Sequence, residues 1–222
     1  MPVFALDKSF LFPPVELAEP DGLLAVGGDL SIKRLLIAYQ NGIFPWPNEN
    51  NILWWSPDPR FVLFPDELKV SKSMEKLLRQ ESFEFTINKD FKQVIDNCKT
   101  VTRKNQKGTW ITQDVKDAYI NFHHAGYAHS AETWLNNELV GGLYGVKIGK
   151  VFFGESMFST VSNASKYVFI KYVQQLIREG IALIDCQVYT PHLESLGATM
   201  ISREMFMKHL NQWLIVNGKM LQ

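Results

Sequence analysis

Two side chains able to act on a substrate stand close together near the end of the chain, Asp185 and Gln187. They follow residues 181–184, a continuous apolar run that predicts a short strand buried on both faces. Because residues two apart point to the same side of a strand, the sequence predicts that a carboxylate and an amide face one cleft. In an isolated Asp-x-Gln, the simpler interpretation is a carboxylate that caps a loop beside a solvent-facing amide.

Other kinds of catalytic chemistry have weaker signals. Residues 154–157, Gly-Glu-Ser-Met, lack the Gly-x-Ser-x-Gly pattern that exposes a serine nucleophile. The histidines within residues 123–129 stand at a predicted helix end and strand start, where they are more often structural than catalytic. Cys98 and Cys186 give neither a paired metal-ligand spacing nor a disulfide framework. The sequence therefore predicts no metal site.

The elements that must position these groups follow from apolar periodicity and from capping and turn residues. Ser31, Asp90 and Thr112 are expected to begin helices, and residues 136–137, Asn-Asn, to form a hairpin turn. Helices are expected over 32–40, 71–80, 90–98, 112–124, 163–179, 191–196 and 202–216, and strands over 83–87, 128–135, 138–146, 150–154, 181–184 and near Thr199.

From residue 83 the predicted order is strand, two helices, three strands, helix, strand, helix, strand. This is the order of the acyl-CoA N-acyltransferase (GNAT-like) fold, so we expect an α+β protein with a mixed sheet. GNAT-like enzymes that use coenzyme A hold its pyrophosphate on a Gly-rich loop at a helix N-terminus. The corresponding loop, expected over residues 155–163, has no glycine and no basic residue, and Glu155 would repel phosphate. The sequence therefore argues against coenzyme A as the acyl donor.

The N-terminal region differs in composition from the rest. Eight of the ten prolines lie in residues 1–59. Because proline lacks a backbone donor and fixes φ, we expect no long strand there, one helix over 32–40, and otherwise irregular, aromatic-rich chain. The sequence predicts a small Pro-rich N-terminal domain, residues 1–65, docked on a larger GNAT-like domain, residues 66–222.

Composition and charge narrow the class of protein. The 222 residues are 46% hydrophobic and 21% charged, which is ordinary globular usage. No apolar run reaches the ~18–20 residues of a membrane helix, and no secretory signal is visible. The 23 basic residues equal the 23 acidic ones, so overall charge gives no sign of nucleic-acid binding. We expect a soluble protein of a reducing compartment.

Seven strings of the chain are unusual enough to identify a family. They are residues 19–30, 42–46, 53–60, 108–112, 154–159, 163–166 and 184–187. Over roughly residues 10–212 the chain resembles the leucyl/phenylalanyl-tRNA–protein transferases. The resemblance implies a cytoplasmic enzyme that takes Leu or Phe from aminoacyl-tRNA and attaches it to proteins with N-terminal Arg or Lys. It also implies that the acceptors are marked for degradation, and that no metal or coenzyme is needed.

The resemblance assigns roles to the polar residues. Asp185 polarises and orients Gln187, whose amide oxygen accepts a hydrogen bond from the attacking α-amine. Glu155 binds the substrate, at the cationic N-terminus of the peptide; its alternative is to cap the helix that begins near residue 163. An α-amine has a reference pKa of ≈ 7.7–8.0, so part of it is neutral near pH 7 and a strong base is unnecessary.

The same resemblance predicts the donor site. Trp46 and Trp110 match the aromatic residues that hold the 3′-terminal adenosine. The Leu or Phe side chain needs an apolar pocket, for which the available residues are Leu143, Phe152, Phe153, Met157, Phe158, Tyr172 and Ile184. Tyr172 departs from the Phe expected in some members, which leaves the Leu-versus-Phe preference open.

Basic residues recur on one predicted helix. Lys69, Lys72, Lys76 and Arg79 are spaced by three or four positions, and Lys72, Lys76 and Arg79 are the ones expected to contact tRNA phosphate. Residues 103–107, Arg-Lys-Asn-Gln-Lys, give a second candidate on a loop. A solvated charged face is the alternative for both.

Two other functions remain open from the sequence. A coenzyme A-dependent N-acetyltransferase would share the fold, and a non-catalytic RNA-binding module could have kept it. The sequence does not fix the oligomeric state; we expect a monomer.

Overall fold

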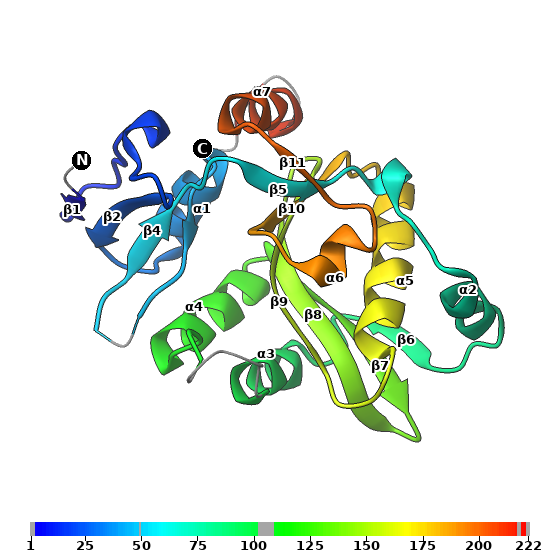
Figure 1. Cartoon of the computed structure of the whole chain (residues 1–222). Coiled ribbons are helices and arrows are strands. Elements are labelled where there is room, and N and C mark those ends of the chain that lie inside the picture. Colours follow the sequence, from blue (N-terminus) through cyan, green and yellow to red (C-terminus); the bar gives the residue numbers. More distant parts are fainter. Residues whose placement is uncertain (1–2, 49, 102–108, 217–218, 221–222) are drawn as a thin grey trace.

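The computed structural model describes residues 3–48, 50–101, 109–216 and 219–220. It contains a four-stranded, a seven-stranded and a two-stranded sheet with helices packed around them (Figure 1). The predicted α+β class with a mixed sheet is confirmed, as is the order of elements predicted from residue 83 onward.

The N-terminal region forms a small sheet of its own, in the order β1-β2-β4-β3. Its strands are β1 (Phe4–Leu6), β2 (Leu23–Gly27), β3 (Phe44–Pro45) and β4 (Leu53–Trp55), with η1 (Val15–Leu17) and α1 (Ile32–Gln40). The predicted helix 32–40 and its Ser31 cap are confirmed. The expectation of otherwise irregular chain was wrong: four strands of two to five residues form here, and one of them, β3, includes Pro45.

The seven-stranded sheet has the order β11-β5-β10-β9-β8-β7-β6. Its strands are β5 (Arg60–Leu63), β6 (Glu84–Ile87), β7 (Ala128–Leu135), β8 (Glu138–Ile148), β9 (Val151–Ser159), β10 (Leu183–Gln187) and β11 (Thr199–Ile201). Within this sheet β9 and β10 run parallel, and every other neighbouring pair is antiparallel. Strand β5 precedes the boundary predicted at residues 65/66 but pairs into this sheet; the two-domain division stays a prediction.

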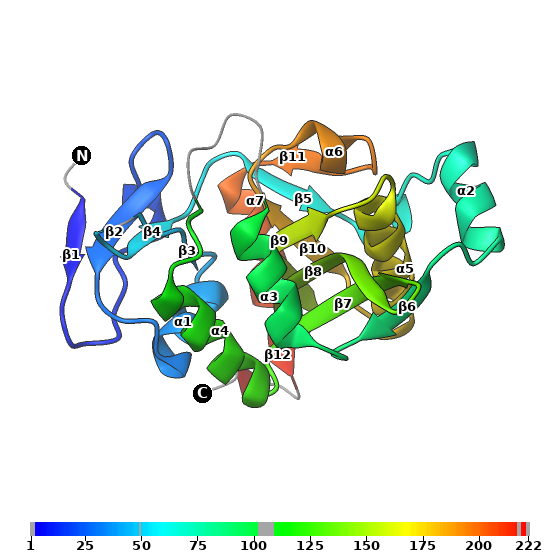
Figure 2. The same ribbon diagram turned by 90° about the horizontal axis from the view of Figure 1, so that it is seen from below.

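Helices cover both faces of the large sheet (Figures 1 and 2). The helices of this region are η2 (Pro65–Glu67), α2 (Lys72–Arg79), α3 (Phe91–Thr100), α4 (Gln113–His124), α5 (Ala164–Arg178), α6 (Pro191–Glu194) and α7 (Arg203–Trp213), of which α2 packs against α5. Two adjacent glycines of β8 face helices on opposite sides of the sheet. A Cβ on Gly141 would lie 2.8 Å from Ala164 of α5, and a Cβ on Gly142 would lie 3.2 Å from Val94 of α3.

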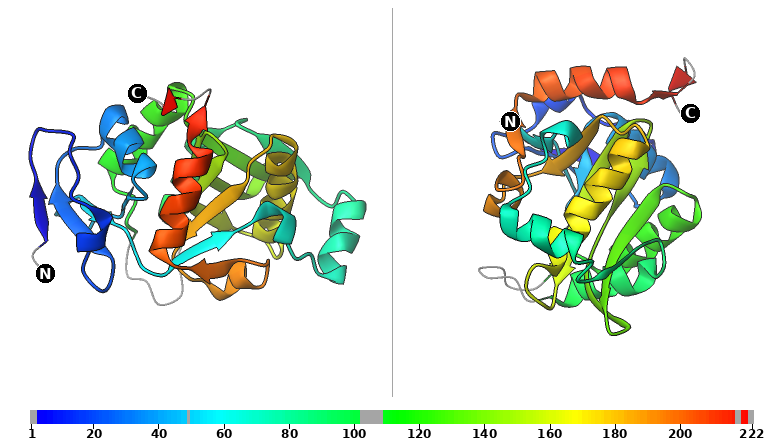
Figure 3. Two further views of the ribbon diagram at one scale, coloured as in Figure 1. Left: turned by 90° about the horizontal axis from the view of Figure 1, so that it is seen from above. Right: turned by 90° about the vertical axis from the view of Figure 1, so that its right-hand side faces the viewer.

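The N-terminal region packs against the rest of the chain without a break in the core. Buried residues from both regions, such as Trp54 and Tyr119, belong to one apolar cluster. Helix α7 lies between the small sheet and the large one (Figure 3). Its residues Phe206 and Met207 pack next to Gly42. Gly42 has a φ of +69°, a conformation that favours glycine, and a Cβ there would also come within 2.7 Å of the Met207 sulfur.

Three predicted boundaries were wrong, two of them in the region that carries the polar residues. Strand β9 was expected to end at residue 154 but continues to Ser159, so residues 156–159 pair with β8 instead of forming a loop. Strand β10 runs to Gln187, not to residue 184. The last helix ends at Trp213, before β12 (Ile215–Val216), which pairs with β13 (Lys219–Met220).

Candidate active site

Two irregularities lie side by side where β9 and β10 stop pairing. The parallel pairing ends at Asp185 opposite Phe153. In β9, the register against β8 shifts so that Glu155 is an extra residue between Gly154 and Ser156. In β10, the register against β5 shifts between Asp185 and Gln187. Because β-bulges re-aim side chains and end pairing, the two strands separate here.

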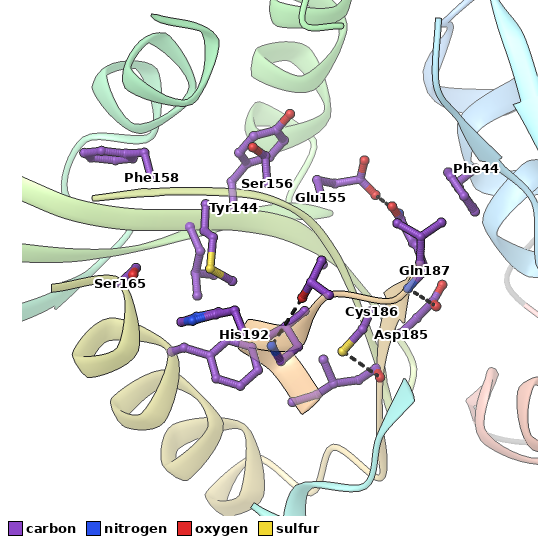
Figure 4. Close-up of a pocket in the computed structure, with 18 of the residues that line it drawn as sticks. Phe44, Tyr144, Glu155, Ser156, Phe158, Ser165, Asp185, Cys186, Gln187 and His192 are labelled. Atoms are coloured by element: carbon purple, nitrogen blue, oxygen red, sulfur yellow. Dashed lines mark hydrogen bonds between the residues drawn. The ribbon is translucent and has the colours of Figure 1, made fainter. Parts of the chain in front are cut away.

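A cavity of about 510 Å³ opens at this point. Both Asp185 and Gln187 line it, as the Asp-x-Gln spacing predicted, and so does Glu155 (Figure 4). The lining also includes Phe44, Trp46, Trp110, Leu143, Phe152, Met157, Phe158, Phe169, Ile184, Cys186, His192 and Leu193.

Glu155 is held by three uncharged donors. Its Oε1 accepts hydrogen bonds from the Tyr39 hydroxyl at 2.8 Å and from the Gln187 Nε2 at 2.9 Å. Its Oε2 accepts from the Tyr119 hydroxyl at 2.9 Å. The two phenol oxygens also lie within hydrogen-bond distance of each other, but because each phenol has one proton, a phenol donates there only when it does not donate to Glu155. Residues from α1, α4, β9 and β10 therefore meet at one carboxylate.

Burial changes the protonation of this group. It raises the pKa of Glu155 to about 7, against the lowering effect of the hydrogen bonds from Tyr39, Tyr119 and Gln187. The negative charge of Asp185 raises it further. Burial and the Glu155 charge raise the pKa of both tyrosines well above its usual value, so the phenols stay protonated and donate. Glu155 can therefore take up or release a proton near neutral pH.

Asp185 has a different environment. Its Oδ1 and Oδ2 accept a bidentate pair of bonds from Arg60 Nε and Nη2, at 2.8 and 2.7 Å, and both side chains are buried. Arg60 also donates to the Gly42 carbonyl at 3.1 Å and lies over the rings of Phe44 and Phe206. Such bidentate pairing fixes orientation as well as charge. Asp185 is thus anchored between the small sheet and α7.

Gln187 sits in a tight turn that Asp185 supports. Its φ is +64°, and the Val188 N–H donates to the Cys186 carbonyl at 2.8 Å. The Gln187 N–H donates to Asp185 Oδ1 at 2.9 Å. A positive φ at a non-glycine residue costs on the order of 1–3 kcal/mol and needs such support. The carboxylate therefore contacts the backbone of Gln187, whereas the side-chain amide contacts Glu155.

Trp46 and Trp110 line the same cavity from two parts of the chain. Trp46 follows β3, is 37% exposed, and its ring centroid lies 6.2 Å from that of Trp55. Trp110 precedes α4 and is half-buried. Two partly exposed indole rings at one cavity give flat surfaces on which a base can stack.

Most of the predicted apolar residues line the cavity, namely Leu143, Phe152, Met157, Phe158 and Ile184. Two of the predicted residues lie behind its wall. Phe153 points to the other side of β9 and packs against Tyr39, with ring centroids 5.0 Å apart. Tyr172 packs edge-on against Phe152 at 5.1 Å. Phe153 and Tyr172 therefore do not line the cavity as predicted. They pack behind it, against Tyr39 and Phe152.

The predicted basic residues lie elsewhere. Lys72, Lys76 and Arg79 are exposed on α2, which projects beyond α5 on the side away from the small sheet (Figure 1). They are not among the residues that line the cavity. Their contact with tRNA phosphate stays a prediction, and residues 103–107 lie outside the described residues.

Sequence reasoning missed three residues that hold the site. Tyr39 and Tyr119 fall on predicted helices, where a buried tyrosine is read as core, and only their shared contact with Glu155 shows more. Arg60 stands within the string 53–60, which was the one available signal for the partner of Asp185.

The residues that the structure describes contain neither a metal-binding cluster nor a membrane-spanning helix. No group of three or more His, Cys, Asp or Glu side chains is placed to hold a metal ion there. No helix in that part of the chain is long and apolar enough to cross a membrane.

Comparisons with known proteins give consistent matches. Residues 62–211 match the family model described as leucyl/phenylalanyl-tRNA protein transferase, and residues 28–58 match its N-terminal domain. A leucyl/phenylalanyl-tRNA–protein transferase of Christiangramia forsetii is 57% identical over 202 residues, covering 90% of this chain and 95% of that protein. One of Syntrophobacter fumaroxidans is 55% identical over 222 residues, covering 99% and 95%. A solved GCN5-related N-acetyltransferase-like protein of Streptococcus suis covers 64% of this chain and 59% of its own, with 13% identity and a TM-score of 0.37.

Proposed function

Because the chain belongs to the leucyl/phenylalanyl-tRNA protein transferase family, we propose that it moves Leu or Phe from aminoacyl-tRNA to the N-terminal α-amine of proteins. It is an aminoacyltransferase. Its acceptors begin with Arg or Lys, its products are marked for degradation, and it acts in the cytoplasm as a monomer.

One observation carries the proposal: a carboxylate able to exchange a proton near pH 7 lies in a cavity with two indole rings and an apolar wall. Trp46 and Trp110 hold the terminal adenosine by stacking. The apolar wall accepts the Leu or Phe side chain. This leaves the ester carbonyl near Glu155 and Gln187, where an incoming amine can be oriented.

The chemistry needs a bond exchange and one proton transfer. The acceptor's α-amine nitrogen bonds to the ester carbonyl carbon, and the bond from that carbon to the ribose oxygen breaks. Glu155 takes the proton that the amine loses and returns it to the ribose oxygen. A pKa near the working pH suits a group with both tasks. Holding amine and ester together contributes further, up to about 7–11 kcal/mol for ideal orientation.

Gln187 and Asp185 position the amine. Gln187 donates its Nε2–H to Glu155, so its amide oxygen remains to accept from the amine. Asp185 acts through the backbone: with Arg60 it holds the turn that places the Gln187 side chain. This modifies the role that the sequence suggested for Asp185, which was to polarise the amide itself.

The test is transfer of labelled Leu or Phe from tRNA to a peptide that begins with Arg, in the absence of added metal or coenzyme. A peptide that begins with Ala is the acceptor control. Incubation with acetyl-coenzyme A, read as a thermal shift and as acetylated peptide, tests the N-acetyltransferase alternative. Acetylation without aminoacyl transfer would replace the proposed function.

The stacking role of the indoles has its own test. Trp46→Ala and Trp110→Ala should each raise KM for aminoacyl-tRNA by roughly five- to a hundredfold, the range for loss of base stacking. Trp→Phe should retain most activity because it keeps a π face. If the Ala variants instead lose Tm and activity together, these side chains are core and not part of the site.

A further inference from the structure

The cavity wall away from Gln187 carries an unpaired polar atom. His192 lines the cavity next to Leu193, and its Nε2 is buried with no hydrogen-bond partner. Figure 4 shows Glu155 and Gln187 toward Phe44, and His192 toward Ser165. Buried polar atoms in proteins nearly always have a partner. An unpaired one in a cavity wall indicates a position where a bound molecule completes the hydrogen bond.

Polar side chains near His192 already make hydrogen bonds within the protein. Thr190 Oγ1 accepts from the Leu193 N–H at 3.2 Å and so begins α6. Ser159 Oγ donates to the Val161 carbonyl at 2.7 Å and accepts from the Ser165 N–H. Glu155 and Asp185 have the partners described above. On this wall of the cavity, the imidazole of His192 therefore has capacity for a new hydrogen bond, as the Gln187 amide oxygen has on the opposite side.

The imidazole of His192 is uncharged, so its Nε2 can donate or accept a hydrogen bond according to the tautomer. Burial lowers the pKa of this imidazole, and the positive charge of Lys166 lowers it further, so the ring is neutral near pH 7. A neutral imidazole has one ring nitrogen that accepts a hydrogen bond. The Nε2 can fill that role toward an N–H donor.

We infer that His192 binds the α-amine of the aminoacyl group on the donor and thereby selects donors whose α-amine is free. The inference rests on the proposed function, because it takes aminoacyl-tRNA as the ligand. In such a donor the α-carbon carries the side chain, the ester and the amine. With the side chain against Phe152, Phe169 and Leu193 and the ester toward Gln187, the amine is left for the wall that carries His192.

This arrangement has a consequence for specificity. An α-amine offers at least two N–H donors in either protonation state, whereas an N-acylated aminoacyl group offers one and adds bulk. A site with an unpaired buried acceptor rejects a ligand that lacks the matching donor. His192 would therefore disfavour donors without an α-amine, and the wall that carries it would exclude N-acylated aminoacyl groups by their added bulk.

The experiment is a double-mutant cycle on binding, which does not require turnover. The probes are 3′-deoxy-3′-(leucylamino)adenosine and its counterpart without the α-amine, and the readout is Kd from tryptophan fluorescence. Wild type should prefer the amine-bearing probe by about 10- to 100-fold, the range for a hydrogen bond to a charged group. His192→Leu should weaken binding of the amine-bearing probe alone, so that the two probes bind equally well. His192→Gln, which has an acceptor oxygen, should restore part of the preference for the amine-bearing probe.

Controls separate the possible outcomes. His124→Leu, on an exposed residue at the end of α4, should leave both affinities unchanged. If His192→Leu weakens binding of both probes equally, or leaves the preference for the amine-bearing probe unchanged, the inference is overturned and His192 has a structural role. Loss of the preference in His192→Leu supports it even if Leu transfer from tRNA is never observed, because that failure would overturn the proposed function alone.

Discussion

The two carboxylates of the cavity have opposite electrostatic environments, although they come from neighbouring strands. Asp185 on β10 is paired with the guanidinium of Arg60, which is itself buried. Glu155 on β9 meets two phenols and an amide, none of which carries a charge. One carboxylate has a counter-ion and the other has only neutral donors.

The comparison teaches which carboxylate can work as an acid–base group. A buried ion pair keeps both partners charged and is costly to break. Neutral donors offset only part of the cost of burying a charge, so Glu155 has a pKa near 7 and exchanges its proton easily. Glu155 is therefore the group that handles the proton, and Asp185 is the group that holds the geometry.

The largest expected effect is on turnover in Glu155→Gln. The substitution keeps the size of the side chain and removes the proton acceptor, so kcat should fall by about 10²- to 10⁴-fold, the range for general acid–base groups. Glu138→Gln, on an exposed residue of β8, is the matched control. If Glu155→Gln has a normal kcat, another group is the acid–base catalyst. The proposed difference in role between Glu155 and Asp185 would then be wrong.

Asp185→Ala should mainly destabilise the fold. It leaves Arg60 buried without a counter-ion, which costs about 3–5 kcal/mol of unfolding free energy, measurable by denaturant titration. The double variant Arg60→Met with Asp185→Leu should recover most of that stability, since an apolar pair often replaces a buried ion pair without loss. Its kcat should stay low, because the Gln187 N–H has lost its acceptor. Recovery of both stability and kcat would show that Asp185 does not position Gln187.

The sequence predicted much of this arrangement but not its electrostatics. Apolar periodicity and capping residues located the helices and strands because those signals are local, as at Ser31 and Thr112. The bulges at Glu155 and after Asp185 could not be predicted, because they depend on register against β8 and β5. The partners of the two carboxylates were missed for the same reason: Tyr39 and Glu155 are 116 residues apart, and Arg60 and Asp185 are 125 apart.

A smaller effect is expected from removing one phenol. Tyr39→Phe and Tyr119→Phe each delete a donor that lowers the pKa of Glu155, so that pKa should rise further. If the ionised form is the active one, the activity profile shifts to higher pH and the rate at pH 7 falls by about 2- to 10-fold. The double variant should lose less than the product of the two, because both phenols contact the same carboxylate. Tyr127→Phe, which packs on Phe122 outside the cavity lining, is the control.

The last expected effect is on the pH dependence of stability. Because the folded state raises the pKa of Glu155 from 4.5 to about 7, it binds this proton more tightly than the unfolded chain does. The stabilisation from the proton is complete below about pH 4.5 and is lost as pH rises toward 7. The Tm of Glu155→Gln minus the Tm of wild type should therefore increase between pH 5 and pH 8, although the kcat of the variant is low. A Tm difference that stays constant over that range would mean that Glu155 is ionised throughout, and that the two carboxylates do not differ in the way proposed.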